Sequence, residues 1–478
     1  MSSRCRLAIA AAAALSAACA AQPQVPADAP ASAPIAAAAD AGRAPFSSTY
    51  EPAASPPTLI RNATVLTGTG ERIDGGDVLI AGGRIESVGK ALAAPDGARV
   101  VEADGRWVTP GLIDVHSHMG VYASPGTNAS DDGNEATDPV TSQVWAEHSV
   151  WPQDPGFEAA LQGGVTSMQI LPGSANLIGG RGVTIKNVPA TTYQAMKFPG
   201  APQGLKMACG ENPKRVYGRD DKFPSTRMGN AAGYRQAFAD AKNYMEDRKE
   251  YDAELAKYEK ERSEGDEDAV APKPPKRDLK LETLAEVMRG NILVHNHCYR
   301  ADEMATMLDI AQEFGYRISA FHHGVEAYKL ADRLAAEGVC GALWADWWGF
   351  KMEAYDGIQE NLALVDYPEG GCAIVHSDSE EGIQRLNQEA AKAVTRGERA
   401  GLDIPPARAI RWVTANPAKA LGVLDRTGTL EAGKMGDVVL WNGSPFSVYA
   451  LADLVFVDGV LLYDRAHPAA KPRSDFQL

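Results

Sequence analysis

The stretch Trp107-Val-Thr-Pro-Gly-Leu-Ile-Asp-Val-His-Ser-His118 decides the fold: it is an apolar run that ends in two histidines spaced one residue apart. Side chains at positions i and i+2 of a β-strand project from the same face, so His116 and His118 would point together from a strand end. Neutral imidazole is the commonest protein ligand of metal ions. We therefore expect this strand end to form part of a metal site.

More histidines follow the same pattern downstream. Val294-His-Asn-His297, Ala320-Phe-His-His-Gly324 and Val375-His-Ser-Asp378 each come at the end of a short apolar run. Seven of the nine histidines therefore fall on four predicted strand ends. The carboxyl ends of barrel strands are where catalytic residues gather, so these side chains are expected to form one site.

Strand-like and helical runs alternate over residues 108–426, which is typical of a parallel α/β architecture. Eight candidate strands are present, the number that a closed barrel needs, and we expect a (β/α)8 TIM barrel. These strands are predicted at residues 111–117, 164–171, 181–188, 203–209, 292–297, 317–323, 339–345 and 372–378. Residues 229–290 do not fit this pattern and are predicted to form a helical insertion, either a substrate lid or a solvated decoration.

Both ends of the chain around this barrel show a different pattern. Residues 58–107 and 427–465 contain short β runs separated by glycine-rich turns, which predicts one composite β-sandwich built from both termini. Four cysteines, Cys209, Cys298, Cys340 and Cys372, lie in or beside predicted barrel strands. We expect them to be buried free thiols, although an oxidising compartment would allow disulfides.

The N-terminus indicates export. Two arginines precede an apolar alanine-rich run that is too short to span a membrane and that ends at Cys19. Residues 1–19 are predicted to be a signal peptide with a lipobox, which gives a periplasmic protein with a lipid anchor through Cys19. Cleavage after Ala18 or Ala20 without lipid is the alternative. Residues 20–57 are rich in alanine and proline and are predicted to be a disordered tether.

Composition sets limits on the partners. The 478 residues are 45% hydrophobic and 23% charged, with a formal net charge of -15. Such an acidic chain is not expected to bind nucleic acid, which requires clustered lysine and arginine. A small molecule or a short peptide is the expected partner, and a homo-oligomer is compatible with the sequence.

Several sequence motifs, in the order in which they occur, resemble those of the metal-dependent amidohydrolase superfamily. The closest similarity is to the imidazolonepropionase-like branch of that superfamily. The motifs are residues 108–118, Gly173-Ser-Ala-Asn-Leu-Ile-Gly-Gly-Arg-Gly-Val-Thr-Ile-Lys186, Gly204-Leu-Lys-Met-Ala-Cys-Gly-Glu-Asn212, Thr414-Ala-Asn-Pro-Ala-Lys-Ala-Leu-Gly422 and Gly428-Thr-Leu-Glu-Ala-Gly-Lys434. The resemblance implies a distorted barrel beside a composite β-sandwich. It also implies one or two divalent metal ions, and we expect zinc.

The resemblance assigns roles to individual positions. The implied metal ligands are His116 and His118 on the first strand, His295 on the fifth, His323 on the sixth and Asp378 on the eighth. A carboxylated lysine on the fourth strand bridges two metals in some members of the superfamily. Lys206 is our candidate for it, with Lys186 and Glu211 as alternatives.

Other side chains are candidates for the pocket. His297 and His376 share the inward face of the predicted ligands and are expected to contact substrate, whereas His322 should point outward. Arg181 could bind a substrate carboxylate through its planar fork, with a structural ion pair as the alternative. Trp344, Trp347 and Trp348 would either form a wall of the pocket or pack in the core.

These residues predict the chemistry. A bound metal generates hydroxide at neutral pH and polarises a carbonyl, and Asp378 would carry the proton from the attacking water to the departing nitrogen. We therefore expect a hydrolase that cleaves a carbon–nitrogen, amide-type bond. The alternatives are a deaminase, an imidazolonepropionase-type hydrolase of cyclic amides and, third, a non-catalytic binding protein.

Overall fold

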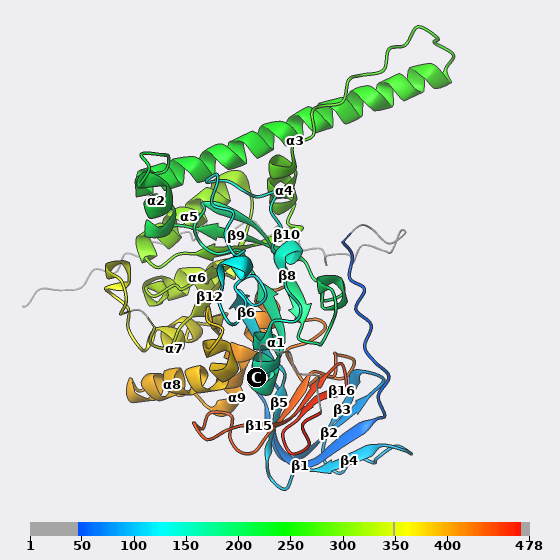
Figure 1. Cartoon of the computed structure of the whole chain (residues 1–478), viewed down its shortest axis with the longest axis vertical. Coiled ribbons are helices and arrows are strands. Elements are labelled where there is room, and N and C mark those ends of the chain that lie inside the picture. The colour runs from blue at the N-terminus through cyan, green and yellow to red at the C-terminus, as the bar shows by residue number, and fades with distance from the viewer. Residues whose placement is uncertain (1–45, 348, 470–478) are drawn as a thin grey trace, which may run out of the picture. The chain divides into compact units, whose positions relative to one another are not determined.

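The computed structural model describes residues 46–347 and 349–469, which form an α/β barrel and a β domain (Figure 1). The β domain is one sheet with the strand order β16-β15-β14-β5-β1-β2-β3, and β4 also pairs with β1. Both ends of the chain contribute, as the sequence predicts. The strands are β1 (Thr58–Leu66), β2 (Arg72–Ala81), β3 (Arg84–Gly89), β4 (Arg99–Glu102), β5 (Trp107–Pro110), β14 (Val438–Trp441), β15 (Ala452–Val457) and β16 (Val460–Asp464).

The second sheet is the barrel, and its eight strands follow one another in chain order from β6 to β13. All eight predicted strands are present, so the expected distorted barrel is confirmed. They are β6 (Leu112–Ser117), β7 (Val165–Ile170), β8 (Ile178–Lys186), β9 (Gln203–Ala208), β10 (Ile292–His297), β11 (Ile318–His322), β12 (Cys340–Leu343) and β13 (Ala373–Val375).

The direction of β8 differs from the parallel arrangement that the sequence pattern suggests. This strand runs antiparallel to both β7 and β9. Residues 171–177 connect β7 to β8, and a link this short cannot hold the crossover helix that a parallel pair requires. The C-terminal end of β8, at Lys186, therefore lies beside Ser167 near the start of β7, at the opposite end of the barrel from the histidines.

Helices follow most of the other barrel strands. One of them, α5 (Ala301–Phe314), stops where Gly315 adopts a left-handed conformation, with φ 74°. The other helices around the barrel are α1 (Pro155–Gln162), α2 (Glu211–Gly218), α6 (Ala331–Glu337), α7 (Asn361–Asp366), α8 (Leu386–Arg399), α9 (Pro406–Ala409) and α10 (Ala415–Ala420). None of the helices in the described part of the chain is long and apolar enough to cross a membrane.

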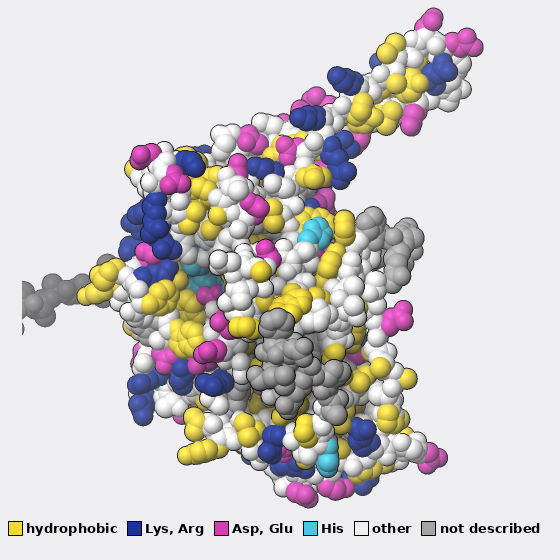
Figure 2. All heavy atoms as spheres, viewed as in Figure 1, with side chains coloured by type: hydrophobic (Ala, Val, Ile, Leu, Met, Phe, Trp, Pro, Cys, Tyr) yellow, Lys and Arg dark blue, Asp and Glu magenta, His cyan; other side chains and the backbone are white. Residues whose placement is uncertain are grey.

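The predicted insertion is a helical arm between β9 and β10. It consists of α3 (Arg227–Ser263), an irregular return segment and α4 (Leu279–Met288). Only the first part of α3 is buried, through residues such as Tyr234 and Phe238, and the remainder projects away from the barrel (Figure 1). Side chains of both charges and apolar side chains cover the projecting part (Figure 2). This geometry fits a solvated decoration better than a lid.

The barrel and the β domain meet at a buried lysine. The Lys186 ammonium lies 2.8 Å from the Asp437 carboxylate and 3.0 Å from that of Asp458, and all three side chains are almost completely buried. Tyr50 donates its hydroxyl to Asp458 over 2.6 Å. Because a buried charge is costly unless it is paired, this network fixes β8 against the β domain.

A second difference from the expectation concerns the last residues of the predicted tether. Residues 46–57 lie within the described part of the chain, and several of them are held by the body of the protein. The Ser48 hydroxyl donates to the Lys197 carbonyl over 2.6 Å, and the Phe46 ring packs on Trp145. The aromatic side chains of Phe46 and Tyr50 contact the body of the protein, which the alanine-rich composition of this segment did not predict. Residues 20–45, the predicted signal peptide and Cys19 lie outside the described residues.

The cysteines correct a third expectation. They form two disulfides, Cys209–Cys298 and Cys340–Cys372, with Cα–Cα distances of 5.2 Å and 4.6 Å. The strand register explains the pairing. Ala208 of β9 lies beside His297 of β10, and Gly341 of β12 lies beside Ala373 of β13, so each cysteine is directly opposite its partner. Free thiols were therefore the wrong expectation.

Candidate active site

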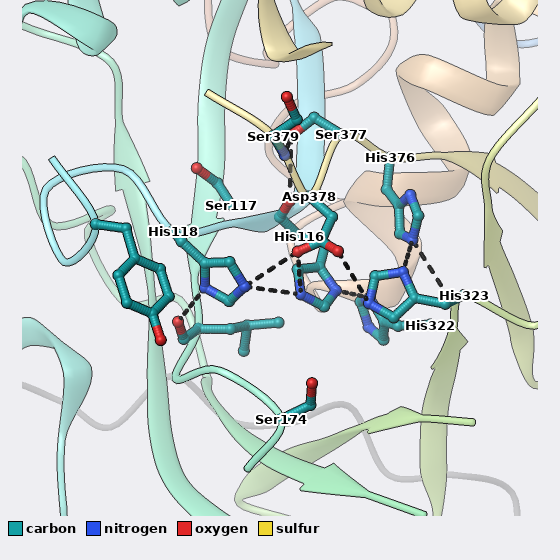
Figure 3. A network of polar contacts seen from close by, with 12 residues as sticks. His116, Ser117, His118, Ser174, His322, His323, His376, Ser377, Asp378 and Ser379 are labelled. Atoms are coloured by element: carbon teal, nitrogen blue, oxygen red, sulfur yellow. Dashed lines mark hydrogen bonds and ion pairs between the residues drawn. The ribbon is translucent and has the colours of Figure 1, made fainter. Parts of the chain in front are cut away.

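The two histidines of the first barrel strand and the aspartate of the last meet at the carboxyl end of the barrel (Figure 3). The Nε2 atoms of His116 and His118 are 3.3 Å apart. One carboxylate oxygen of Asp378 lies 3.1 Å from the Nε2 atom of His118 and 3.5 Å from that of His116. The structure thus brings these three predicted residues together with donor atoms close enough to share one metal ion.

Two more histidines, which follow β11 and β13, complete this cluster. The His323 Nε2 atom lies 3.7 Å from the second oxygen of Asp378, and the His376 Nε2 atom lies 2.8 Å from His323 Nδ1. His116, His323 and His376 form a second group whose donor atoms could hold a metal. His323 and Asp378 have positive φ angles of 57° and 51°, a strained conformation that is found preferentially at functional sites.

Lys206 of β9 lies at the base of the same cluster. Its ammonium is 3.2 Å from His116 Nε2 and donates to the Pro172 carbonyl over 3.1 Å. Burial lowers the pKa of Lys206 to about 8, which eases conversion to the neutral amine that carboxylation needs. The alternative residues make other contacts: Lys186 is paired at the β domain, and Glu211 lies 3.5 Å from the Lys351 ammonium.

The two histidines of β10 lie at different depths. His295 is the register partner of Lys206, and a Cβ atom on Gly204 would be only 3.1 Å from the His295 ring, so this ring extends towards the start of β9. The His297 ring centre is 4.8 Å from that of His323, and neither of its nitrogens has a hydrogen-bond partner among the described residues. The geometry therefore favours His297 over His295 as the ligand from this strand.

His322 corrects a further expectation. It is fully buried and points inward, where its Nδ1 atom lies 2.9 Å from His116 Nδ1 and its Nε2 atom lies 2.9 Å from His295 Nδ1. The strict alternation of side chains breaks because the next residue, His323, has a left-handed conformation. Two consecutive residues can therefore face the interior. His322 orients His116 and His295 through their second ring nitrogens.

Arg181 is not part of the cluster. Its guanidinium donates to the Thr283 hydroxyl at 2.8 and 2.9 Å and to the Gln203 side chain at 2.8 Å, and it stacks over Trp145. These contacts lie on the outer side of β8, since Gly180, the preceding residue, pairs with Lys206. The structure therefore does not support substrate binding by Arg181, and a structural role explains it.

The cluster fits a divalent metal. Burial lowers the pKa of His116, His297 and His323 far below the ordinary value, so these imidazoles are neutral, which is the form that binds metal. Burial alone would raise the pKa of Asp378, but its hydrogen bond with His118 and the nearby charges lower it overall. The carboxylate is therefore ionised at neutral pH. Buried imidazole nitrogens without partners among the described residues complete a donor set that suits a divalent metal ion.

A pocket opens above the cluster, with a volume of about 430 Å³. It is lined by His118, Met119, Tyr122, Asn134, Gly173, Ser174, Asp378, Ser379 and Glu380. Trp344 stacks on the ring of His323 at 4.3 Å and is buried in an apolar cluster with Tyr299, which fits the core-packing alternative, whereas Trp347 is exposed. Trp348 lies outside the described residues.

Sequence reasoning missed two sets of residues around this pocket. Asp114 precedes His116 by two positions on the same strand, and this spacing could have identified it. It accepts hydrogen bonds from the backbone N–H groups of His116 and Ser377. Tyr299 and Lys351 belong to connecting segments, and no motif marks them. Tyr299 packs on His297 and Lys351 lies over Tyr299, because β10 and β12 are both neighbours of β11.

The barrel and its donor set define the class: a metal-site barrel with ligands at the carboxyl ends of its strands. Comparison with known proteins agrees. The amidohydrolase family profile matches residues 374–462. A solved amidohydrolase structure from Thermotoga maritima MSB8 is 37% identical, with a TM-score of 0.73, and the match covers 85% of this chain and all of that one.

Two curated relatives add to this comparison. Amidohydrolase tasK of Hapsidospora irregularis is 34% identical over 451 residues, which are 87% of this chain and 44% of that protein. A dihydroorotase of Geobacter sulfurreducens is 35% identical over 108 residues, which are 23% of this chain and 20% of that protein. The chain thus spans less than half the length of either relative. It belongs to the amidohydrolase family, within the metal-dependent amidohydrolase superfamily.

Proposed function

We propose that this protein is a hydrolase that cleaves a carbon–nitrogen, amide-type bond in a small molecule or short peptide. The observation that carries this proposal is the convergence of His116, His118, His323 and Asp378 above Lys206 at the floor of an open pocket. Imidazole, carboxylate and lysine donors in this arrangement suit one or two divalent ions, and zinc is the metal we propose.

Asp378 is the proposed proton carrier. When bound, the metal supplies a water nucleophile at neutral pH and a positive charge for the scissile carbonyl. The Asp378 carboxylate is ionised, and 27% of its side chain is exposed towards the pocket, so water and substrate can reach it. It would accept the proton of the attacking water and deliver this proton to the departing nitrogen. His118 holds one of its oxygens at 3.1 Å.

Asp378→Asn tests this role. The substitution keeps the size of the side chain and one oxygen but removes the basic group, so turnover should fall by about 10²-fold or more. Metal content, measured by elemental analysis, should remain close to that of the wild type. Nearly normal turnover with metal retained would refute the role of Asp378.

The substrate class is the open part of this proposal. A screen of the metal-loaded protein against N-acyl amino acids, dipeptides and cyclic amides would find it. The relatives named dihydroorotase justify cyclic amides in that screen, and with them imidazolonepropionase-type chemistry. Release of ammonia would favour the deaminase alternative, and metal binding without any turnover would favour a binding protein.

We also propose that the protein is exported to the periplasm and lipid-anchored through Cys19. The two disulfides support export, because such bonds persist in oxidising compartments and are rare in the cytosol. Mass spectrometry of the membrane fraction should detect a lipid-modified Cys19, and Cys19→Ser should release the protein into the soluble periplasm. A mature N-terminus at Ala21 without lipid would refute the anchor.

A further inference from the structure

A buried tyrosine beside the candidate ligands has no role in the proposed chemistry. Tyr299 follows β10, and its ring centre lies 4.7 Å from that of His297 and 6.0 Å from that of His323. The residue is only 3% exposed. Burial and the charges of the Asp378, Glu353 and Glu211 carboxylates raise the pKa of this tyrosine, and its hydroxyl is hydrogen-bonded to none of these carboxylates. The hydroxyl therefore lies beside the candidate ligands without a carboxylate partner among the described residues.

A lysine lies beside this tyrosine. Lys351 comes from the segment after β12, and its ammonium is 4.4 Å from the centre of the Tyr299 ring. It donates to the Asn212 amide oxygen over 3.1 Å and lies 3.5 Å from Glu211, while 14% of its side chain is exposed. An ammonium has three donors, so one remains for an incoming acceptor after these two contacts.

Hydrogen bonds connect Lys351 to the pocket. The Asn212 amide nitrogen donates to the Ser174 hydroxyl over 2.9 Å, and Ser174 lines the pocket above the metal-ligand candidates (Figure 3). Asn212 therefore positions both the ammonium and the pocket wall. Lys206, the other buried lysine near the cluster, is held against His116 and cannot serve a substrate group at a distance from the metal.

We infer that Tyr299 and Lys351 form a subsite for a carboxylate of the substrate. The inference rests on the proposed function, because it assigns a substrate class to the same site. A charged donor and a neutral donor side by side suit an anion, and charge-assisted hydrogen bonds are the stronger kind. Trp344, with its ring centre 6.2 Å from that of Tyr299, offers an apolar surface beside them. The substrate class is thus an amide with a free carboxylate and an apolar side chain, such as an N-acyl amino acid.

The test compares N-acetyl-L-phenylalanine with its uncharged C-terminal amide. In the metal-loaded wild type, kcat/KM should be higher for the carboxylate. Lys351→Met should reduce the ratio of the two kcat/KM values by about tenfold or more, since one good ionic hydrogen bond is worth about that factor. The lower kcat/KM of Lys351→Met for the carboxylate substrate should come mainly from a higher KM. Tyr299→Phe should reduce the ratio less, and Lys351→Arg should restore most of it.

Matched controls are available outside the pocket. Tyr316 is another buried tyrosine whose hydroxyl lacks a partner among the described residues, but its ring stacks on Phe238. Lys329 pairs with Asp356 at 2.6 Å at the surface. Tyr316→Phe and Lys329→Met should leave the carboxylate-to-amide ratio unchanged. Equal effects of these controls and of the Lys351 and Tyr299 variants would overturn the inference.

A binding measurement separates this inference from the proposed function. In the metal-loaded Asp378→Asn background, tryptophan fluorescence or calorimetry should show binding of N-acetyl-L-phenylalanine that weakens about tenfold with Lys351→Met. If this binding is seen but the wild type does not hydrolyse the compound or any other amide, the proposed hydrolase activity would be refuted and the carboxylate subsite supported. Equal binding of acid and amide, or no binding of the acid, would overturn the subsite even if other amides are hydrolysed.

Discussion

The Asp114 carboxylate in the first barrel strand accepts hydrogen bonds from the backbone N–H and the hydroxyl of Ser377, which follows the last barrel strand. β6 and β13 are the two ends of the barrel sheet, so this contact joins the ends that no ladder of strand hydrogen bonds connects. The Asp378 N–H also donates to the His116 carbonyl over 3.0 Å. The positions of His116 and Asp378 relative to each other therefore depend on this closure.

Loss of the Asp114 carboxylate, which joins the two ends of the barrel sheet, should weaken metal binding. Asp114→Ala leaves the buried polar groups of Ser377 and the His116 N–H without their acceptor. Groups that orient metal ligands typically contribute 10- to 100-fold in affinity, so competition with a chelator should show a loss of about that size. The melting temperature should fall as well. Unchanged metal affinity in a folded Asp114→Ala protein would show that the closure does not control the site.

The number of bound metal ions tests whether Lys206 is a carboxylated, bridging ligand. If this lysine is carboxylated, the wild type should hold close to two divalent ions, and Lys206→Ala should hold one or fewer. Lys186→Ala is the matched control, because Lys186 is also fully buried in a barrel strand. It should keep the wild-type metal content but lose about 3–5 kcal/mol of stability, because Asp437 and Asp458 lose their partner. A wild-type stoichiometry of one would eliminate the bridging lysine.

Much of the fold could be predicted from local patterns. The alternation of strand-like and helical runs identified all eight barrel strands, and the motif around His116 indicated where the site would lie. The direction of β8 could not be predicted from its composition, because direction depends on how the link to the preceding strand is built. The disulfides depend on register: the cysteines are 89 and 32 positions apart, and only the pairing of neighbouring strands brings them together.

In the site, too, some features could be predicted from local sequence patterns and others could not. Spacing on one strand predicted that His116 and His118 point together, and they do. The inward position of His322 depends on a left-handed residue that nothing in the sequence marks. Arg181 is conspicuous in its glycine-rich context, yet it lies on the outer face of an antiparallel strand. Residue type is the basis of the chemistry proposed for the site, whereas backbone conformation decides which side chains reach it.

The two disulfides should differ in their effect on metal binding. Cys209 and Cys298 immediately follow β9 and β10, the strands of Lys206 and His297, whereas Cys340 and Cys372 join the opposite ends of β12 and β13. Replacing either pair by alanine should cost about 2–4 kcal/mol of stability. Only loss of the first pair should lower metal affinity, measured by chelator competition. Equal losses of affinity would indicate a general loosening of the barrel.

Acid should unfold the metal-free protein steeply, because six buried imidazoles are held neutral. Their pKa values are lowered by burial, to about 3 for His295 and about 4 for His376. The other four are His116, His297, His322 and His323, in which the direction of the shift is the same. Below about pH 6.5 the unfolded chain binds protons at these positions and the native protein does not, so stability falls as the pH falls.

Each such histidine contributes a slope of about 1.4 kcal/mol per pH unit once the unfolded form is protonated. Urea unfolding of the chelator-treated protein between about pH 5 and pH 7.5 measures the sum as a pH dependence of the unfolding free energy. The slope from these groups should vanish above about pH 7, because neither state is then protonated. His295→Asn should reduce the acid slope by about one histidine's share, whatever it does to stability at neutral pH. A wild-type slope near zero at pH 5.5 would mean that the imidazoles take up protons in the folded protein, and the neutral donor set would then be wrong.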